Sequence, residues 1–223
     1  MFLQHHRAAE VLLIATIIGA ALAEWAVTLR ERIRTTLRPN AALGARIRLG
    51  LQTLVETTTV RTQDNAPADR GTKYVLAGSL VIAIAAGWTV ARHVPSLEVP
   101  GNGWAWVLAG VAIIWLGIGL RVWAIAVLGR FFRRDVLIQE GHEVVTAGPF
   151  RVVRHPAYAG NLLAAVGLGI ALGNTLALVI LVVVPLLGHI PRIRVEEAEL
   201  TRALGEPYHR YAQTTARIIP GIW

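Results

Sequence analysis

One short segment of this chain gathers polar chemistry directly in front of an apolar run. Residues 148–160 read GPFRVVRHPAYAG, with two arginines, one histidine, two prolines and two aromatic residues. A proline crowds the residue before it, so we expect His155 in extended geometry and Pro156 in the first turn of a helix. Backbone N–H groups at a helix start bind carboxylates and phosphates, and Arg151 and Arg154 add positive charge. The segment predicts an anion receptor at the mouth of a membrane helix. The alternative is an interfacial anchor that reaches toward lipid headgroups.

A second segment, PRIRVEEAELTRALG, places arginine and glutamate at helical spacing. Arg192 and Glu196 are four residues apart and share a helix face, whereas the adjacent Glu196 and Glu197 point about 100° apart. We expect Pro191 to start this amphipathic helix and Gly205 to end it. A carboxylate here can offset a positive charge on a ligand or bind its hydroxyl groups. The alternative is a solvated helix with an ordinary ion pair.

Several other kinds of chemistry are excluded or disfavoured. The chain has no cysteine, so it has no disulfide, zinc–thiolate site or cysteine nucleophile. Histidines outside the first segment, such as His189, show no metal-ligand spacing, and we interpret them as interface residues; no metal is expected. GxSxG, Walker and GxGxxG patterns are missing, which argues against α/β-hydrolase, nucleotide-hydrolase and Rossmann folds. The arginines behind the net charge of +8 cluster in particular loops, which favours membrane topology over nucleic-acid binding.

The composition is that of an integral membrane protein. Hydrophobic residues make up 54% of the 223 residues and charged residues 16%, against about 25% charged in an average soluble domain. A span takes about 20 residues, so the apolar runs predict five transmembrane helices in one all-α domain. We read the first run as a retained span, not as a signal peptide. The predicted spans are residues 11–29, 74–90, 104–128 and the two halves of 157–188.

The last apolar run is predicted to be a helical hairpin that turns at Gly173 and Asn174. Each half has about 15 residues and rises about 22 Å, less than the roughly 30 Å hydrocarbon core. The hairpin would thin the bilayer or lie among other helices. A single bent, re-entrant element is the alternative. Arg121 lies inside the third span, where it marks a pocket or path unless its side chain snorkels to the membrane surface.

The distribution of arginine predicts the orientation. Residues 30–73, 129–156 and 191–217 are basic, whereas the connection at 91–103 is not. Five crossings bring the three basic regions to one side, which the positive-inside rule makes cytoplasmic. Within 30–73, apolar residues recur at helical spacing, as in an amphipathic helix on the membrane surface or a short soluble helix packed on the domain. One lysine against 21 arginines indicates a GC-rich bacterial genome, and hence the inner membrane.

Residues 130–222 resemble the isoprenylcysteine carboxyl methyltransferase family, which belongs to a wider group of membrane methyltransferases that includes phospholipid methyltransferases. The resemblance rests on RHPxY, an apolar hairpin, EE, LG and ExYxxY in that order. It implies S-adenosylmethionine as methyl donor and a lipophilic acceptor, with carboxylate O-methylation favoured. N-methylation of a phospholipid or another amine is the alternative.

The resemblance also implies site residues. In the family, the cofactor is held by positions that match His142, Glu143, Val144, Val145, Phe150, His155, Pro156, Ala157, Tyr158 and Glu196. Phe150 stands where the family often has tyrosine, which removes a hydroxyl. Arg192 matches the arginine that the family assigns to the substrate, and we take Arg192 and Arg154 as the catalytic candidates. The cofactor carries a carboxylate and a sulfonium, and an aromatic face such as that of Tyr158 attracts cations.

We therefore expect a membrane enzyme with two functional parts. Residues 1–128 would supply three spans and the basic cytoplasmic loop at about 30–73. Residues 129–223 would supply the methyltransferase core, namely the cofactor motif, the hairpin and a cytoplasmic C-terminal helical cap. A carboxylate is already nucleophilic at pH 7, so O-methylation needs positioning and dehydration but no dedicated base. An amine acceptor would need one, with Glu196 or Glu197 as candidates.

Two rival functions remain open at this point. One is an NADPH-dependent membrane reductase of the same wider fold, and the other is a non-enzymatic transporter or scaffold. The expected partners are a lipophilic or prenylated acceptor and membrane lipids, and neither nucleic acid nor metal.

Overall fold

The computed structural model describes residues 6–36, 48, 71–132 and 143–223. Regular structure in these residues is helical, apart from two isolated bridges. The helices are α2 (Arg7–Thr36), α4 (Thr72–His93), η1 (Pro95–Leu97), α5 (Gly103–Leu128), η2 (Gly129–Phe131), η3 (Gly148–Arg151), α6 (Pro156–Leu172), α7 (Thr175–Leu204) and α8 (Glu206–Thr214).

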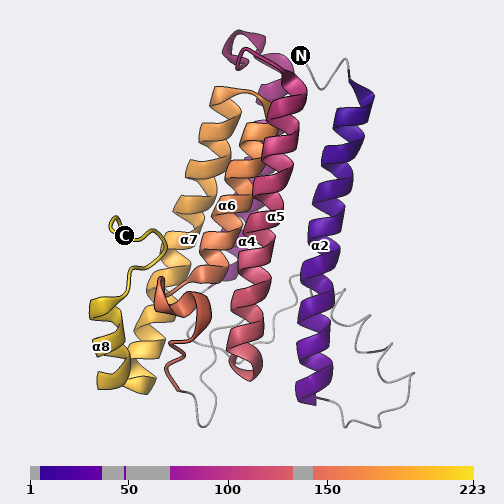
Figure 1. The fold of residues 1–223 in the computed structure, drawn as a ribbon. Coiled ribbons are helices and arrows are strands. Elements are labelled where there is room, and N and C mark those ends of the chain that lie inside the picture. The colour runs from indigo at the N-terminus through magenta and orange to yellow at the C-terminus, as the bar shows by residue number, and fades with distance from the viewer. Residues whose placement is uncertain (1–5, 37–47, 49–70, 133–142) are drawn as a thin grey trace.

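The helices α2, α4, α5, α6 and α7 run alongside one another as a bundle, with α2 at one edge (Figure 1). Neighbours pack in the order α2, α5, α6, α7, α4. Among the described residues, four helices are long and apolar enough to cross a membrane, namely α2, α4, α5 and α7. Large apolar side chains such as Val11, Leu22 and Val81 are exposed on the outer faces, where a bilayer would cover them. The predicted all-α membrane fold is confirmed.

The fifth predicted crossing is α6, which is shorter than the others. Its 17 residues rise about 25 Å. Nine buried residues on this helix pack it between α5 and α7, as expected for a short helix among longer neighbours. The total of five crossings stays a prediction.

Glycines allow α5 and α6 to pack at backbone distance. A Cβ added to Gly160 would lie 2.5 Å from the carbonyl oxygen of Gly117, and one on Gly117 would lie 2.6 Å from that of Gly160. Gly110 and Gly167 repeat this relation further along the two helices. Small residues at such crossings let membrane helices approach closely. Gly160 therefore serves contact with a neighbouring backbone.

The turn between α6 and α7 confirms the predicted hairpin. Gly173 ends α6 with a left-handed φ of 61°. The Asn174 side chain then accepts a hydrogen bond from the backbone N–H of Ala177, 3.0 Å away, and caps α7. The same side chain donates to the carbonyl oxygen of Val94 at 2.9 Å. The turn is thus attached to the segment that follows α4.

The prediction that a new helix begins at Pro191 is wrong. The 30-residue α7 continues through both Pro185 and Pro191, and ends, as predicted, at Gly205. An isolated helix would break at such prolines, but neighbouring helices let a membrane helix keep them, and α7 packs against both α4 and α6. The second half of the hairpin is therefore longer than expected, and it carries Arg192 and Glu196 on one uninterrupted helix.

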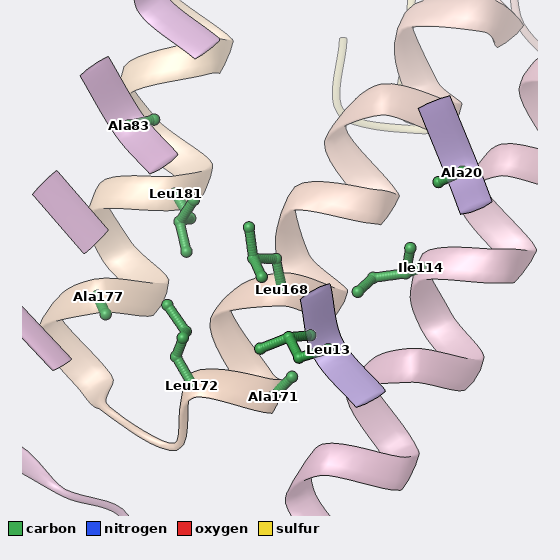
Figure 2. Close-up of a cluster of buried hydrophobic side chains, with 9 residues drawn as sticks. All are labelled: Leu13, Ala20, Ala83, Ile114, Leu168, Ala171, Leu172, Ala177 and Leu181. Atoms are coloured by element: carbon green, nitrogen blue, oxygen red, sulfur yellow. The ribbon is translucent and has the colours of Figure 1, made fainter. Parts of the chain in front are cut away.

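Two apolar clusters hold the bundle together. The larger one combines side chains from all five long helices (Figure 2): Leu13, Ala20, Ala83, Ile114, Leu168, Ala171, Leu172, Ala177 and Leu181. A smaller cluster joins Leu162 of α6, Ile193 of α7 and Ile218 of the C-terminal segment, with Tyr158 packed against it. This second cluster fixes the three segments that carry the predicted site.

The described helix ends fall into two groups at opposite ends of the bundle, and which end faces the cytoplasm stays a prediction. The connection after α4 and the hairpin turn lie at one end of the bundle, whereas η3, α8 and the last turns of α7 lie at the other (Figure 1). The predicted amphipathic helix within 30–73 lies largely outside the described residues.

Candidate active site

Residues of α6 and α7 predicted from the sequence meet at the end of the bundle opposite the hairpin turn. The hydroxyl of Tyr158, in the first turn of α6, donates a hydrogen bond to Oε2 of Glu196 at 2.7 Å. Nε of Arg192 donates to the same hydroxyl oxygen at 3.3 Å. Arg192 is buried, and its Nη1 also reaches Oγ1 of Thr72, at the start of α4, at 3.4 Å. The expectation that Arg192 and Glu196 share one face of a helix is met.

Glu197 organises the other side of this cluster. Its Oε1 lies 3.2 Å from Nε2 of His155 and 3.2 Å from Nη1 of Arg154. Its Oε2 accepts a hydrogen bond from Nε of Arg217 at 3.0 Å. Sequence reasoning considered Glu197 only as a base for an amine acceptor and missed this role. The sequence does indicate that the adjacent Glu196 and Glu197 point about 100° apart on the helix. Each of them must therefore have different partners.

The C-terminal segment holds the RHP motif in place. The backbone N–H of Arg154 donates to the carbonyl of Ala216 at 2.8 Å, and that of His155 to the carbonyl of Arg217 at 3.0 Å. Pro156 occupies the first turn of α6, as predicted, whereas His155 has a φ of −122° and a ψ of 60°, which lies outside the extended geometry predicted for it. The last residues of the chain therefore position a motif that lies some sixty residues earlier.

The mouth of α6 offers fewer backbone donors than the sequence indicates. The N–H groups of Tyr158 and Ala159 both donate to the carbonyl of His155, at 3.1 and 3.0 Å. Positive charge at this mouth comes instead from side chains, in particular the largely buried guanidinium of Arg154.

A side-chain hydrogen bond connects α8 to η3, which carries Phe150. The hydroxyl of Tyr211 donates to the carbonyl oxygen of Phe150 at 2.7 Å, and the Phe150 side chain is buried. Burial raises the pKa of Tyr211 to about 12, so this hydroxyl keeps its proton at neutral pH. Tyr208 is buried beside it, and burial raises the pKa of its hydroxyl as well. These contacts attach α8 to the segment that carries Phe150, and the cytoplasmic cofactor cap stays a prediction.

The remaining predicted residues lie around this cluster or outside the described ranges. His142 is not among the described residues. Glu143 is exposed, and Val144 and Val145 are half-buried; they lie upstream of η3. Within the described part of the chain, no hydrogen bond or ion pair connects these three to the cluster.

Arg121 links the site to the N-terminal helix. Its Nη2 lies 2.7 Å from Oε1 of Glu24 in α2, and its Nη1 donates to the carbonyl of Ala157 at 3.3 Å. The two charges that interrupt the first and third spans thus neutralise each other. This pair reaches the first turn of α6, next to Tyr158.

Four buried polar atoms near this cluster have no hydrogen-bond partner in the described part of the chain. They are Nε of Arg121, Nε of Arg154, the hydroxyl of Tyr208 and Nε2 of His189. Buried polar groups are nearly always paired, so such atoms call for an explanation, and a ligand is one.

Comparison with known proteins decides the family. The model of the isoprenylcysteine carboxyl methyltransferase family matches residues 110–202. The probable protein-S-isoprenylcysteine O-methyltransferase of Oryza sativa subsp. indica is 31% identical over 166 residues, which cover 70% of this chain and 87% of the rice protein. The chain belongs to the isoprenylcysteine carboxyl methyltransferase family.

Further relatives agree with this assignment. Protein-S-isoprenylcysteine O-methyltransferase B of Arabidopsis thaliana is 34% identical over 127 residues, which cover 55% of this chain and 64% of that protein. The solved structure of the eukaryotic intramembrane Ras methyltransferase ICMT has a TM-score of 0.55 at 20% identity, covering 96% of this chain and 93% of that one. At that identity the likeness shows the shared fold.

Membership of the family makes this chain an integral membrane carboxyl O-methyltransferase that uses S-adenosylmethionine. The described residues fit this cofactor. Its carboxylate, hydroxyl groups and ring nitrogens accept hydrogen bonds, and the unpaired Arg154 Nε and Tyr208 hydroxyl can donate them. Its sulfonium is a cation, and Glu196 and the Tyr158 ring offer a carboxylate and an aromatic face.

Proposed function

We propose that the protein methylates the carboxylate of a lipophilic acceptor of the isoprenylcysteine kind, at the α6–α7 end of the bundle. The curated relatives are named for this acceptor class. The observation that carries the proposal is the Tyr158 hydroxyl between Glu196 and Arg192. It brings a carboxylate suited to a cationic methyl donor close to a buried guanidinium suited to an anionic acceptor.

Arg192 would orient the acceptor, and Glu196 would face the methyl donor. When bound, S-adenosylmethionine supplies an electrophilic methyl group on a sulfonium sulfur. Arg192 and Glu196 are four residues apart, about 6 Å along the axis of α7, so both can act on reacting groups that meet between them. The burial of Arg192 keeps water from an acceptor carboxylate held there, which strengthens its electrostatic orientation.

The remaining side chains would position these groups. Because a carboxylate acceptor has no proton to lose, Glu197 need not act as a base, and its contacts with His155, Arg154 and Arg217 indicate a structural task. Arg154 is proposed to contact the bound cofactor or acceptor through Nε, while its Nη1 stays paired with Glu197.

We also propose the division of labour and the location. Residues 129–223 would form the methyltransferase core, and residues 1–128 would form much of the lipid-facing wall through which an acceptor enters from the bilayer. The concentration of arginine near one end supports a cytoplasmic active site. The excess of arginine over lysine is typical of a GC-rich bacterial genome and supports a bacterial inner membrane.

The test is a methylation assay on the full chain in lipid nanodiscs, with methyl-labelled S-adenosylmethionine and N-acetyl-S-farnesylcysteine. We expect a labelled product from which mild alkali releases the label, because a methyl ester hydrolyses and a methylated amine does not. We expect Arg192→Gln to lower kcat/KM about a hundredfold or more, since removing a group aimed at the reacting charge costs that much.

Arg202→Gln is the matched control, because Arg202 is exposed on the same helix and pairs with Glu199. It should methylate at the wild-type rate. Alkali-stable label would show methylation at nitrogen or carbon and contradict the proposal. Tight NADPH binding without S-adenosylmethionine binding would also contradict it, in favour of a reductase.

A further inference from the structure

His189 presents a buried hydrogen-bond acceptor that the proposed chemistry does not use. The side chain is fully buried in α7, and its Nδ1 lies 2.6 Å from the carbonyl oxygen of Pro185. A carbonyl only accepts, so Nδ1 carries the proton, and Nε2 of the neutral ring holds a lone pair. This fixed tautomer makes Nε2 an acceptor of hydrogen bonds.

Nε2 of His189 has no hydrogen-bond partner in the part of the chain that the structure describes. Leaving a buried acceptor unpaired is unfavourable, and native structures contain few such groups. A phenylalanine would fill the same space at no such cost. A donor that arrives with a ligand would account for a histidine at this position.

The ring lies directly beside the proposed reaction site. Pro185, His189, Arg192 and Glu196 follow one another at spacings of four, three and four residues, so they lie on one face of α7. His189 lies about 4.5 Å deeper along the helix axis than Arg192. The ring of Tyr158 packs edge-on against it, with the centroids 5.2 Å apart.

We propose that His189 is a specificity-determining residue, whose Nε2 accepts a hydrogen bond from an N–H or O–H group that the methyl acceptor carries next to its carboxylate. This inference rests on the proposed function, because it takes the acceptor carboxylate to be held at Arg192. In a prenylated C-terminal cysteine, an amide N–H is attached to the carbon that bears the carboxylate. When the carboxylate is held at the Arg192 guanidinium, this amide N–H comes within reach of Nε2 of His189, about one helical turn away.

The contacts of Tyr158 connect access to Nε2 of His189 with the binding of the methyl acceptor. The Tyr158 hydroxyl accepts a hydrogen bond from Nε of Arg192, and the Tyr158 ring packs edge-on against the His189 ring. An acceptor carboxylate that binds Arg192 competes with this hydroxyl, so the exchange that admits the carboxylate also moves the ring away from Nε2. One displacement then opens both positions.

The test compares two acceptors that share the same lipid and the same carboxylate. N-acetyl-S-farnesylcysteine carries the amide N–H, and S-farnesyl-3-mercaptopropionic acid lacks it. We expect wild-type kcat/KM to favour the first about tenfold or more, since a site built to bond a donor rejects an analogue without it. His189→Phe, which keeps an aromatic ring against Tyr158, should bring the ratio close to one. His189→Gln, whose amide oxygen can take the place of Nε2, should restore part of the preference.

A merely structural role of His189 would slow both acceptors alike and leave their ratio unchanged, which would overturn the inference. Equal use of both acceptors by the wild type would overturn it too. If the wild type methylates neither acceptor, the proposed function fails, and this inference fails with it. Should His189→Phe not fold, His189→Asn serves in its place. Its amide can still donate to the Pro185 carbonyl but does not reach the position of Nε2, and the same loss of preference is expected.

Discussion

At the scale of single residues, Glu197 is the side chain on which most of the site geometry depends. It joins Arg154 and His155 from the start of α6 to Arg217 from the C-terminal segment. We expect Glu197→Gln to lower the free energy of unfolding by about 2–3 kcal/mol, because it leaves the largely buried Arg154 guanidinium without its counter-charge. Affinity for S-adenosylmethionine should fall about tenfold as the motif loosens. Thermal unfolding and calorimetric binding of the cofactor measure the two effects.

Glu199→Gln provides the comparison for that variant. Glu199 lies two residues further along α7 and pairs with the exposed Arg202, a contact worth a few tenths of a kcal/mol. This variant should unfold and bind as the wild type does. If Glu197→Gln behaved the same way, the view that Glu197 organises the site would be wrong.

At the scale of helices, the crossing of α5 and α6 sets the position of the site. Gly117 and Gly160 bring the two backbones together, and Gly160 lies two residues from Tyr158 on α6. We expect Gly117→Ala to lower the free energy of unfolding by about 1–3 kcal/mol, because its methyl group would lie 2.6 Å from backbone atoms of α6 and force the helices apart. Unfolding in detergent, followed by circular dichroism, measures this.

Gly119→Ala separates packing from helix propensity. Gly119 lies two residues away on α5, and a Cβ added there meets nothing within 4 Å. Alanine is the better helix former, so this variant should be as stable as the wild type or slightly more stable. Equal melting of the two variants would show that close packing at Gly117 is not required.

What the sequence predicts at this scale depends on whether a feature is local. Gly173 and Asn174 make a turn through their own conformation and hydrogen bonds, and the hairpin is predicted correctly. Pro191 looks like a helix start because the local sequence does not reveal that α4 and α6 pack against α7. That packing keeps α7 continuous. The pairing of side chains across the bundle is likewise not predicted from the local sequence.

The site shows the same distinction. The RHP motif and the shared face of Arg192 and Glu196 follow from neighbouring positions, and both are predicted. The partners of Glu197 come from segments 20 and 42 residues away, and those of Arg121 from 36 and 97 residues away. Only the fold brings these partners together, so the contacts of Glu197 and the Glu24–Arg121 pair are not predicted from the sequence.

At the scale of the whole molecule, the arrangement of the bundle and its charge indicate one orientation. The site, η3 and α8 lie at one end, and the short connection after α4 lies at the other (Figure 1). The connection at 91–103 carries little positive charge, whereas the described residues of the three basic regions lie toward the site end. A cofactor made in the cytosol and an acceptor dissolved in the bilayer can both reach a site placed there.

The absence of cysteine from the sequence makes this orientation directly testable. Ser96→Cys places a thiol on an exposed residue of η1, and Ala203→Cys places one on an exposed residue near the end of α7. Because arginine-rich loops stay in the cytoplasm, we expect a membrane-impermeant maleimide to label Ser96→Cys in intact bacterial cells, and to label Ala203→Cys only after the membrane is permeabilised. The unsubstituted chain is the blank, and retained methylation activity shows that each variant is folded. Labelling of Ala203→Cys in intact cells would place the site outside the cytoplasm, away from the supply of S-adenosylmethionine, and would rule out the proposed arrangement.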